Sequence, residues 1–189
     1  MAPSDANAGA TQIRISGFGG QGVVLAGILL GKAASLYDGK EAVFTQSHGP
    51  EARGGASSAD VIISKSPVDY PLVTNPDILV ALFQEAYVRF RPQLKENGVL
   101  IVEQDLVQLN ENDTGCLRIP ATRIATNFFN RIVTNVVMLG YMVGKTGIVG
   151  RESLEQAIRS SVPAKALDMN LNAFAAGYER AVNGKACHE

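Results

Sequence analysis

The pattern of apolar and polar residues predicts strands that alternate with helices over the first two thirds of the chain. Six short runs, apolar or alternating and bounded by glycine or polar residues, are typical of strands: 12–16, 41–46, 59–64, 78–83, 99–102 and 116–120. The run at 99–102 is apolar throughout, as in a strand that is buried on both faces. Apolar residues at helical spacing predict helices over 23–37 and 85–94. This alternation predicts a layered α/β sheet.

The last third of the chain has a helical pattern throughout. Apolar residues at helical spacing predict helices over 127–144, 151–160 and 165–182. The first of these begins after Thr126 or Asn127 as its N-cap. Its apolar stripe consists of Phe128, Ile132, Val136, Leu139 and Val143. We therefore expect an α/β fold, a single-domain Rossmann-like layered sheet with helices on both faces and a helical C-terminal third.

The predicted helix over 23–37 is apolar nearly all round, with Lys32 as its only charged residue. Such a helix is covered on more than one side. The sheet can cover one side, and a partner protein could cover the other. Gly27 and Gly31 lower helix propensity by about 1 kcal/mol each relative to alanine. Because they lie four residues apart, we expect them to allow a close approach of another element.

The domain boundaries follow from the ends of the pattern. Residues 1–11 are rich in alanine, glycine and asparagine and are predicted to form a disordered N-terminal tail. One domain spans 12–184, and 185–189 form a C-terminal tail. The N-terminal stretch lacks the apolar segment of a signal peptide. The longest apolar stretch, 132–144, is shorter than the roughly 20 residues that span a bilayer. We therefore expect a cytoplasmic protein that does not enter a membrane.

Composition narrows the possible ligands. The 189 residues have a net charge of −1 and a sequence pI of about 6.1, which provides no field for binding nucleic acid. The two cysteines, Cys116 and Cys187, are too few for an iron–sulfur cluster, which usually takes four. No Cys or Cys/His spacing indicates zinc. We expect two free thiols and no metal site in this chain.

A glycine-rich loop follows the first predicted strand and precedes the first predicted helix. Its sequence fits G-x-G-x-x-G, and its candidate cofactor-binding residues are Gly17, Gly19, Gly20, Gln21 and Gly22. Glycines let the backbone approach a phosphate, and the helix N-terminus offers unpaired N–H groups. The alternative is a tight strand-to-helix turn that binds nothing. The dinucleotide version of the motif also needs an acidic residue at the end of the second strand, and 45–48 contain none.

A second polar loop lies between the second and third predicted strands. Its candidate binding residues are Ser47, His48, Glu51, Arg53, Gly54 and Gly55. A guanidinium group beside flexible backbone suits a phosphate or carboxylate. His48 is the only histidine outside the C-terminal tail and so the one internal candidate for proton transfer near neutral pH. Alternatively, His48, Glu51 and Arg53 pair with one another, or across a subunit interface, to fix the loop.

The chain lacks the motifs of a self-sufficient catalyst. It contains no G-x-S-x-G elbow and no Walker A sequence. One loop histidine with no evident nucleophile leaves the catalytic residues unassigned.

The two motif loops together resemble the γ subunits of 2-oxoacid:ferredoxin oxidoreductases. The resemblance is carried by Gly-Phe-Gly-Gly-Gln-Gly-Val-Val from Gly17, by segment 45–64, and by Asn135 in a helix that continues Met-Leu-Gly. It runs from about 12 to 182. The family includes enzymes for pyruvate, 2-oxoglutarate, 2-ketoisovalerate, indolepyruvate and phenylglyoxylate. The sequence does not indicate which of these acids is used, since Phe128, Phe129 and Tyr87 are expected in the core rather than in an aromatic-substrate pocket.

The resemblance implies a subunit that does not act alone. The complex decarboxylates a 2-oxoacid on thiamine diphosphate with Mg²⁺, passes electrons to iron–sulfur clusters and transfers the acyl group to coenzyme A. The implied partners are α, β and ferredoxin-like δ subunits, with a flavin or NAD subunit also possible. No cofactor is assigned to this chain alone. Arg53 and the loop from Gly17 to Gly22 are the candidates for holding an anionic ligand such as the coenzyme A phosphates.

Two other functions remain open at this stage. The chain could be a purely structural subunit of the same complex, since the sequence does not separate contacts with a ligand from contacts with other subunits. It could also be a stand-alone nucleotide-binding dehydrogenase, which accounts for the glycine loop but lacks the acidic residue after the second strand.

Overall fold

The computed structural model describes residues 9–47 and 56–184. Its centre is a six-stranded sheet in the order β2-β3-β1-β4-β5-β6. The strands are β1 (Thr11–Phe18), β2 (Glu41–Ser47), β3 (Ala56–Ser64), β4 (Ile78–Ala81), β5 (Val99–Glu103) and β6 (Leu117–Ile119). All six strands predicted from the sequence are present.

The sheet is mixed rather than wholly parallel. β1, β4, β5 and β6 run parallel to one another, whereas β3 is antiparallel to both β1 and β2. Every residue of β3 is buried, as expected of a strand with neighbours on both sides and helices on both faces. Because the carboxyl ends of parallel strands meet at one edge of a sheet, the loops after β1 and β6 leave the sheet on the same side.

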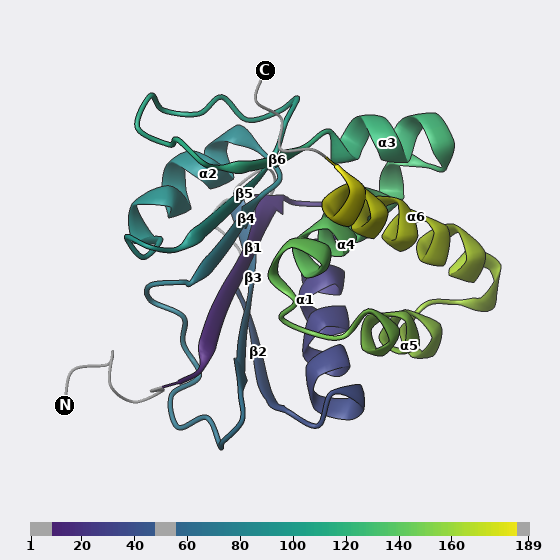
Figure 1. The fold of residues 1–189 in the computed structure, drawn as a ribbon, viewed down its shortest axis with the longest axis horizontal. Coiled ribbons are helices and arrows are strands. Elements are labelled where there is room, and N and C mark those ends of the chain that lie inside the picture. The colour runs from purple at the N-terminus through teal and green to yellow at the C-terminus, as the bar shows by residue number, and fades with distance from the viewer. Residues whose placement is uncertain (1–8, 48–55, 185–189) are drawn as a thin grey trace.

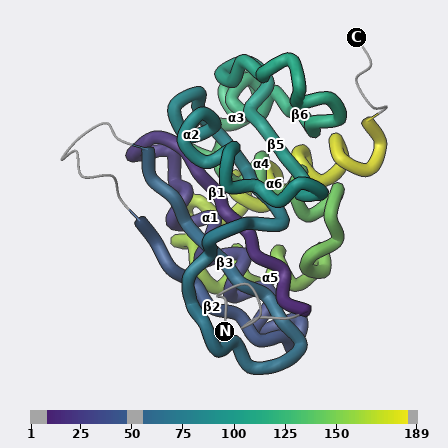
Figure 2. Tube along the Cα trace, turned by 90° about the vertical axis from the view of Figure 1, so that its left-hand side faces the viewer, coloured from purple at the N-terminus to yellow at the C-terminus, as the bar shows by residue number. Residues whose placement is uncertain are grey.

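Helices cover both faces of the sheet (Figure 1), which confirms the predicted fold class. The helices are α1 (Val23–Lys32), α2 (Gln84–Phe90), α3 (Ala121–Phe128), α4 (Thr134–Thr146), α5 (Arg151–Ser161) and α6 (Ala164–Asn183). α2 lies on one face and α1, α4, α5 and α6 on the other. Figure 2, which looks from the α2 side, shows the strands between these two layers. The larger hydrophobic core lies beneath the four-helix layer and the smaller beneath α2.

Helix α1 is covered by the sheet and by helices of its own chain. A π-helical segment, Ala33–Tyr37, continues it, so the predicted helix over 23–37 is present as two segments. α1 contacts β2 and β3 on one side and α4 and α5 on the other. Helices of the same chain thus cover the second side, where a partner protein was one possibility. Gly27 does allow a close approach: a Cβ there would lie 2.7 Å from the Phe44 ring, whereas Gly31 has no such neighbour.

Helices α4 and α6 pack with their backbones almost in contact. A Cβ on Gly140 would lie 2.3 Å from the Phe174 carbonyl oxygen, and a Cβ on Gly177 would lie 2.0 Å from the Val137 carbonyl oxygen. Glycine is required at both positions because the obstacle in each case is backbone. Figure 1 shows α6 lying across α4 on the outer side of the layer.

The predicted helix over 127–144 is wrong in its first part. The chain forms α3, turns at Phe129 (φ −139°, ψ −103°) and begins α4 only at Thr134. Asn130, not Thr126 or Asn127, supplies a cap, since its side chain accepts a hydrogen bond from the Ile132 N–H at 3.0 Å. As a result Phe128 and Ile132, expected on the buried stripe, are 73% and 71% exposed.

The start of β1 and the described range bear on the predicted tails. The N-terminal tail was predicted over 1–11, whereas β1 already begins at Thr11. Residues 1–8 of that tail and the tail predicted over 185–189 lie outside the described residues. No helix in the described part of the chain combines the length and the apolar character that a membrane span requires.

Candidate functional site

The glycine loop connects the centre of the sheet to α1 through a tight turn. The Gln21 N–H donates to the Phe18 carbonyl oxygen at 3.1 Å. Gly20 (φ 93°) and Gly22 (φ 72°) adopt left-handed conformations, which non-glycine residues rarely do. Gly22 is the N-cap residue of α1. The strand–loop–helix context predicted for this motif is therefore confirmed.

The side chain of Gln21 fixes the loop from within. Its Oε1 accepts a hydrogen bond from the Phe18 N–H at 2.6 Å, and its Nε2 donates to the Leu82 carbonyl oxygen at 3.4 Å. Gly17 leaves room for this amide, since a Cβ there would lie 2.6 Å from Gln21 Oε1. Gln21, a predicted cofactor-binding residue, thus uses its amide to tie its own loop to the backbone of Leu82 after β4, and Gly17 leaves room for that amide.

Asn135 links the first turn of α4 to the start of α1. Its Nδ2 donates to the Gly22 carbonyl oxygen at 3.0 Å, and the residue is only 3% exposed. A Cβ on Gly22 would lie 2.5 Å from that Nδ2. The close contact explains why a left-handed glycine and an asparagine occur together here, although they are 113 positions apart in the sequence.

The loop borders a hollow of about 370 Å³ at the carboxyl edge of the parallel strands. Its lining consists of Phe18, Gly19, Gly20, Gln21, Thr122, Arg131, Ile132 and Thr134. Gly19 and Gly20 are exposed and have open space where a Cβ would lie. Arg131 is the only charged side chain in this lining and is exposed. An arginine that lines the same hollow as exposed backbone at a helix start suits an anionic group.

Sequence reasoning missed Arg131, Thr122 and Thr134, because they lie about a hundred positions from the glycine loop. They reach the hollow because β6 places α3 and the turn after it at the same sheet edge as the end of β1. The rule that ligands bind beyond the carboxyl ends of parallel strands was the available signal. It required the strand order, which the sequence pattern does not provide.

The second predicted loop begins and ends beside the first. Ser47 lies exposed at the end of β2, opposite Ser58. At the start of β3, Ala56 pairs with Phe18 and Ser57 with Gly17, whose carbonyl oxygen accepts from the Ser57 hydroxyl at 3.4 Å. The remaining predicted residues, His48, Glu51, Arg53, Gly54 and Gly55, lie outside the described part of the chain. The register therefore places both attachment points of that loop at the glycine-loop edge of the sheet.

Glu103 anchors the α3 side of the hollow. It is fully buried at the end of β5. Its two carboxylate oxygens accept hydrogen bonds from the Asp105 N–H at 2.9 Å and the Thr122 N–H at 3.3 Å. Burial raises the pKa of the Glu103 carboxyl, and the backbone hydrogen bonds only partly oppose that effect. Since Thr122 lines the hollow, this carboxyl group positions one of its walls.

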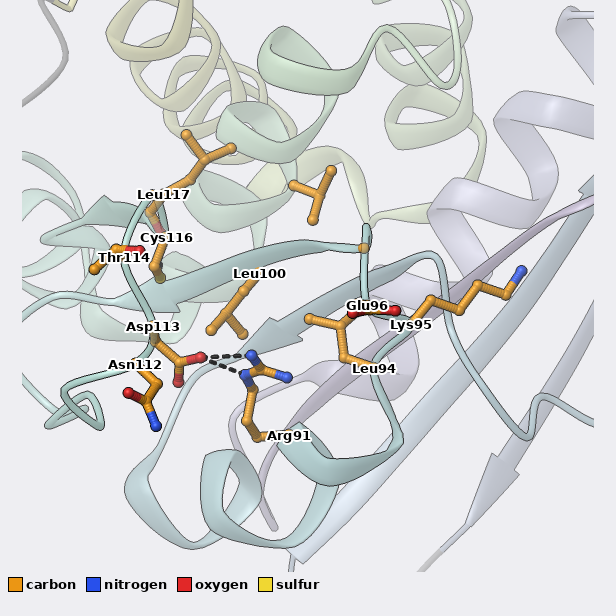
Figure 3. A pocket seen from close by; sticks show the side chains of 13 residues that line it. Arg91, Leu94, Lys95, Glu96, Leu100, Asn112, Asp113, Thr114, Cys116 and Leu117 are labelled. Carbon is orange, nitrogen blue, oxygen red and sulfur yellow. Dashed lines mark hydrogen bonds and ion pairs between the residues drawn. The ribbon is translucent and has the colours of Figure 1, made fainter.

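A second polar hollow of about 380 Å³ lies on the α2 face (Figure 3). Arg91 and Asp113 point toward each other across it, with an ion pair of 2.6 Å, and the Tyr87 hydroxyl also donates to Asp113. Burial alone would raise the pKa of the Asp113 carboxyl, but hydrogen bonds from Arg91 and Tyr87 outweigh it and lower the pKa. This network ties the connection between β5 and β6 to α2, and Tyr87 is buried as predicted.

The described residues do not form a metal site. No three His, Cys, Asp or Glu side chains come together within 9–47 and 56–184. Cys116 borders the α2-face hollow, where burial raises the pKa of its thiol to about 12. It is therefore a protonated thiol at neutral pH, which is neither a good metal ligand nor a good nucleophile.

Comparisons with known proteins agree in pointing to one family. Residues 12–180 match the family model described as pyruvate ferredoxin/flavodoxin oxidoreductase. The 2-oxoglutarate synthase subunit KorC of Methanocaldococcus jannaschii is 54% identical over 172 residues, which cover 89% of this chain and 92% of the relative. The solved γ subunit of a keto/oxoacid ferredoxin oxidoreductase from Geobacter sulfurreducens PCA is 46% identical with a TM-score of 0.85, covering 94% of this chain and 99% of that chain.

A third relative carries the same domain within a longer polypeptide. The ketoisovalerate oxidoreductase subunit VorA of Methanothermobacter thermautotrophicus is 36% identical over 172 residues. The match covers 89% of this chain but only 36% of the relative. In VorA, therefore, nearly two thirds of the polypeptide lies outside the domain that the two proteins share.

Proposed function

This chain belongs to the pyruvate ferredoxin/flavodoxin oxidoreductase family, and we propose that it is the γ subunit of a complex that oxidises 2-oxoglutarate. Its relatives are subunits of 2-oxoacid oxidoreductases, so the chain is one component of a hetero-oligomeric oxidoreductase. The choice of 2-oxoglutarate is supported by KorC subunits of three archaea that are 54%, 50% and 50% identical. The ketoisovalerate and pyruvate subunits compared are no more than 36% identical, and the KorC subunit of Archaeoglobus fulgidus is also 36% identical.

In this proposal the reaction takes place in the complex and not in this chain alone. Thiamine diphosphate supplies decarboxylation, iron–sulfur clusters accept the electrons, and coenzyme A accepts the acyl group. We assign the thiamine, the Mg²⁺ and the clusters to α, β and ferredoxin-like δ subunits in the cytoplasm. Cys116 of this chain is half-buried, and burial raises the pKa of its thiol to about 12, which does not suit a cluster ligand.

The hollow beside the glycine loop is the observation that supports a ligand-binding role for this subunit. Gly19 and Gly20, whose backbone is exposed, and Arg131 line the same hollow. This arrangement suits a phosphate group, so we assign the hollow to an anionic ligand, with the coenzyme A phosphates as the candidate. The loop that carries Ser47, His48, Glu51, Arg53, Gly54 and Gly55 is attached at the same edge of the sheet and is proposed to contribute to that site.

The test uses the complex purified through a tag on this chain. Replacing Arg131 with alanine removes a charge-assisted contact of about 1.5–3 kcal/mol, so we expect the KM for coenzyme A to rise about tenfold or more. Arg159→Ala is the matched control, since Arg159 is an exposed arginine of α5 that lines none of the hollows described above. Arg53→Ala should raise the same KM. Unchanged coenzyme A kinetics in both Arg131→Ala and Arg53→Ala would contradict the anion site.

A purely structural role is the second candidate, and one observation favours it. Both hydrogen bonds of the Gln21 amide go to backbone, at Phe18 and at Leu82, as expected of a residue that only shapes a contact surface. Under that role, loop variants would reduce recovery of the other subunits without changing the KM for coenzyme A in the complexes that do form. The kinetic and assembly measurements therefore separate the two functions.

A further inference from the structure

Two large apolar side chains are exposed beside the candidate site. Phe128, at the end of α3, is 73% exposed, and Ile132, in the turn before α4, is 71% exposed. They lie four positions apart on one short segment. Single exposed apolar side chains are ordinary on a protein surface, but contiguous apolar patches mark interaction sites.

An apolar groove extends this surface on one side. The groove has a volume of about 640 Å³ and lies between α3 and the end of α6. Ile124, Phe128, Phe129 and Ala176 form its apolar lining. On the other side Ile132 borders the glycine-loop hollow. The exposed surface, which we call the α3 face and define by Phe128, Ile132 and this groove, thus runs from the groove to the candidate site.

Charged groups on the α3 face indicate the chemistry of what covers it. Arg131 borders the glycine-loop hollow, and Arg180 borders the groove beside Glu179. Among the described residues neither arginine has a carboxylate within ion-pair distance. The two arginines outnumber the one glutamate, so a complementary surface is apolar at its centre and acidic at its edge.

We propose that the α3 face binds the subunit that corresponds to the extra polypeptide of VorA. This inference rests on the proposed function and names the partner. In VorA about a third of the chain matches this protein, and the remainder is covalently joined to it. Where the shared domain is a separate chain, that remainder is a separate subunit that needs a noncovalent contact. The α3 face supplies an apolar centre of the kind that such interfaces use.

This placement would bring the partner subunit to the edge of the candidate site. A partner that covers Phe128 and Ile132 would also reach the glycine-loop hollow, which Ile132 lines. The anionic ligand would then be held between two subunits rather than in an open hollow on one.

Two variants of the tagged chain test the proposal in the intact complex. F128S/I132S removes the apolar centre of the α3 face, and V88S is the matched control, since Val88 is 61% exposed on α2 at the opposite face of the sheet. We expect F128S/I132S to recover at least about tenfold less of the partner subunit, as loss of two central interface residues does, and V88S to recover the wild-type amount.

A photo-crosslinking amino acid at position 128 or 88 provides a readout that does not depend on weakened assembly. We expect position 128 to crosslink to the subunit homologous to the VorA remainder, and position 88 not to. Crosslinks from 128 to another copy of this chain, or wild-type recovery with F128S/I132S, would overturn the inference alone. Failure of the wild-type chain to recover any thiamine-dependent oxidoreductase subunit would instead overturn the proposed function.

Discussion

The buried carboxyl group of Glu103 shows how a single residue outside the binding surface shapes the site. It accepts backbone hydrogen bonds from Asp105 and from Thr122, at the start of α3. Its burial favours the protonated form, whereas its hydrogen-bond partners favour the charged one. The position of the α3 wall is therefore linked to the ionisation of a group that no ligand touches.

A stability measurement can test this link. Because the pKa of Glu103 is raised in the fold, the unfolded chain binds fewer protons than the fold between the ordinary value of 4.5 and the raised value. The contribution of Glu103 to the free energy of unfolding is thus largest at low pH and falls as pH rises through that window. Urea unfolding at several pH values measures the free energy of unfolding of the wild type and of Glu103→Gln. The difference between the two free energies should decline as pH rises. A difference that rises with pH would mean that the carboxyl is stabilised as the anion.

At the scale of single residues, the sequence predicted the local motif and not its distant partners. Gly17, Gly20 and Gly22 follow from the strand–loop–helix pattern, because every requirement lies within a few positions. Arg131 and Asn135 meet the same loop from more than a hundred positions away, and no local pattern encodes that contact. For Phe128 the prediction was wrong, because helical spacing continued through a turn that Asn130 caps.

Among the elements, helices α4 and α6 pack so closely that glycine is required at Gly140 and Gly177. Both helices were predicted, but their close packing was not, although small residues recur every four positions at Gly140 and Gly144 and at Ala173, Gly177 and Ala181. Close approach was expected at Gly27 and Gly31 instead, and only Gly27 has it. A glycine permits close approach, but which glycine is used depends on how the elements cross.

Two glycine-to-alanine variants follow from this difference. Gly177→Ala places a methyl group against the Val137 carbonyl oxygen, so we expect it to lower the free energy of unfolding by about 3 kcal/mol. Gly31→Ala meets no atom within 4 Å and gains helix propensity, so it should raise that free energy by about 0.5–1 kcal/mol. Chemical denaturation of both variants measures the two changes. Equal effects would mean that the α4–α6 contact is looser than described.

For the whole molecule, the sequence predicted the fold class but not the strand order. The alternation of strands and helices along the chain is sufficient to predict an α/β sheet. It did not reveal that β3 lies between β1 and β2, because strand neighbours are set by long-range pairing. That order matters for function, since the pairing of Phe18 with Ala56 brings the two motif loops to one edge.

The substrate is a property of the complex and is tested at that scale. We expect the purified complex to oxidise 2-oxoglutarate, in the presence of coenzyme A, at least about tenfold more efficiently than pyruvate or 2-ketoisovalerate, which corresponds to about 1.4 kcal/mol. The ratio of kcat/KM values measures this preference. Equal or greater efficiency with pyruvate would reassign the substrate and leave the family membership unchanged.

The internal bonding of the glycine loop has a consequence for ligand capture. Loops rich in glycine normally lose much conformational entropy when they close on a ligand. Here Gln21 holds the turn from one side and Asn135 holds Gly22 from the other, so this part of the backbone is already ordered when the chain folds. The entropic penalty therefore falls on folding rather than on binding, and contacts to the ligand can appear more fully as affinity.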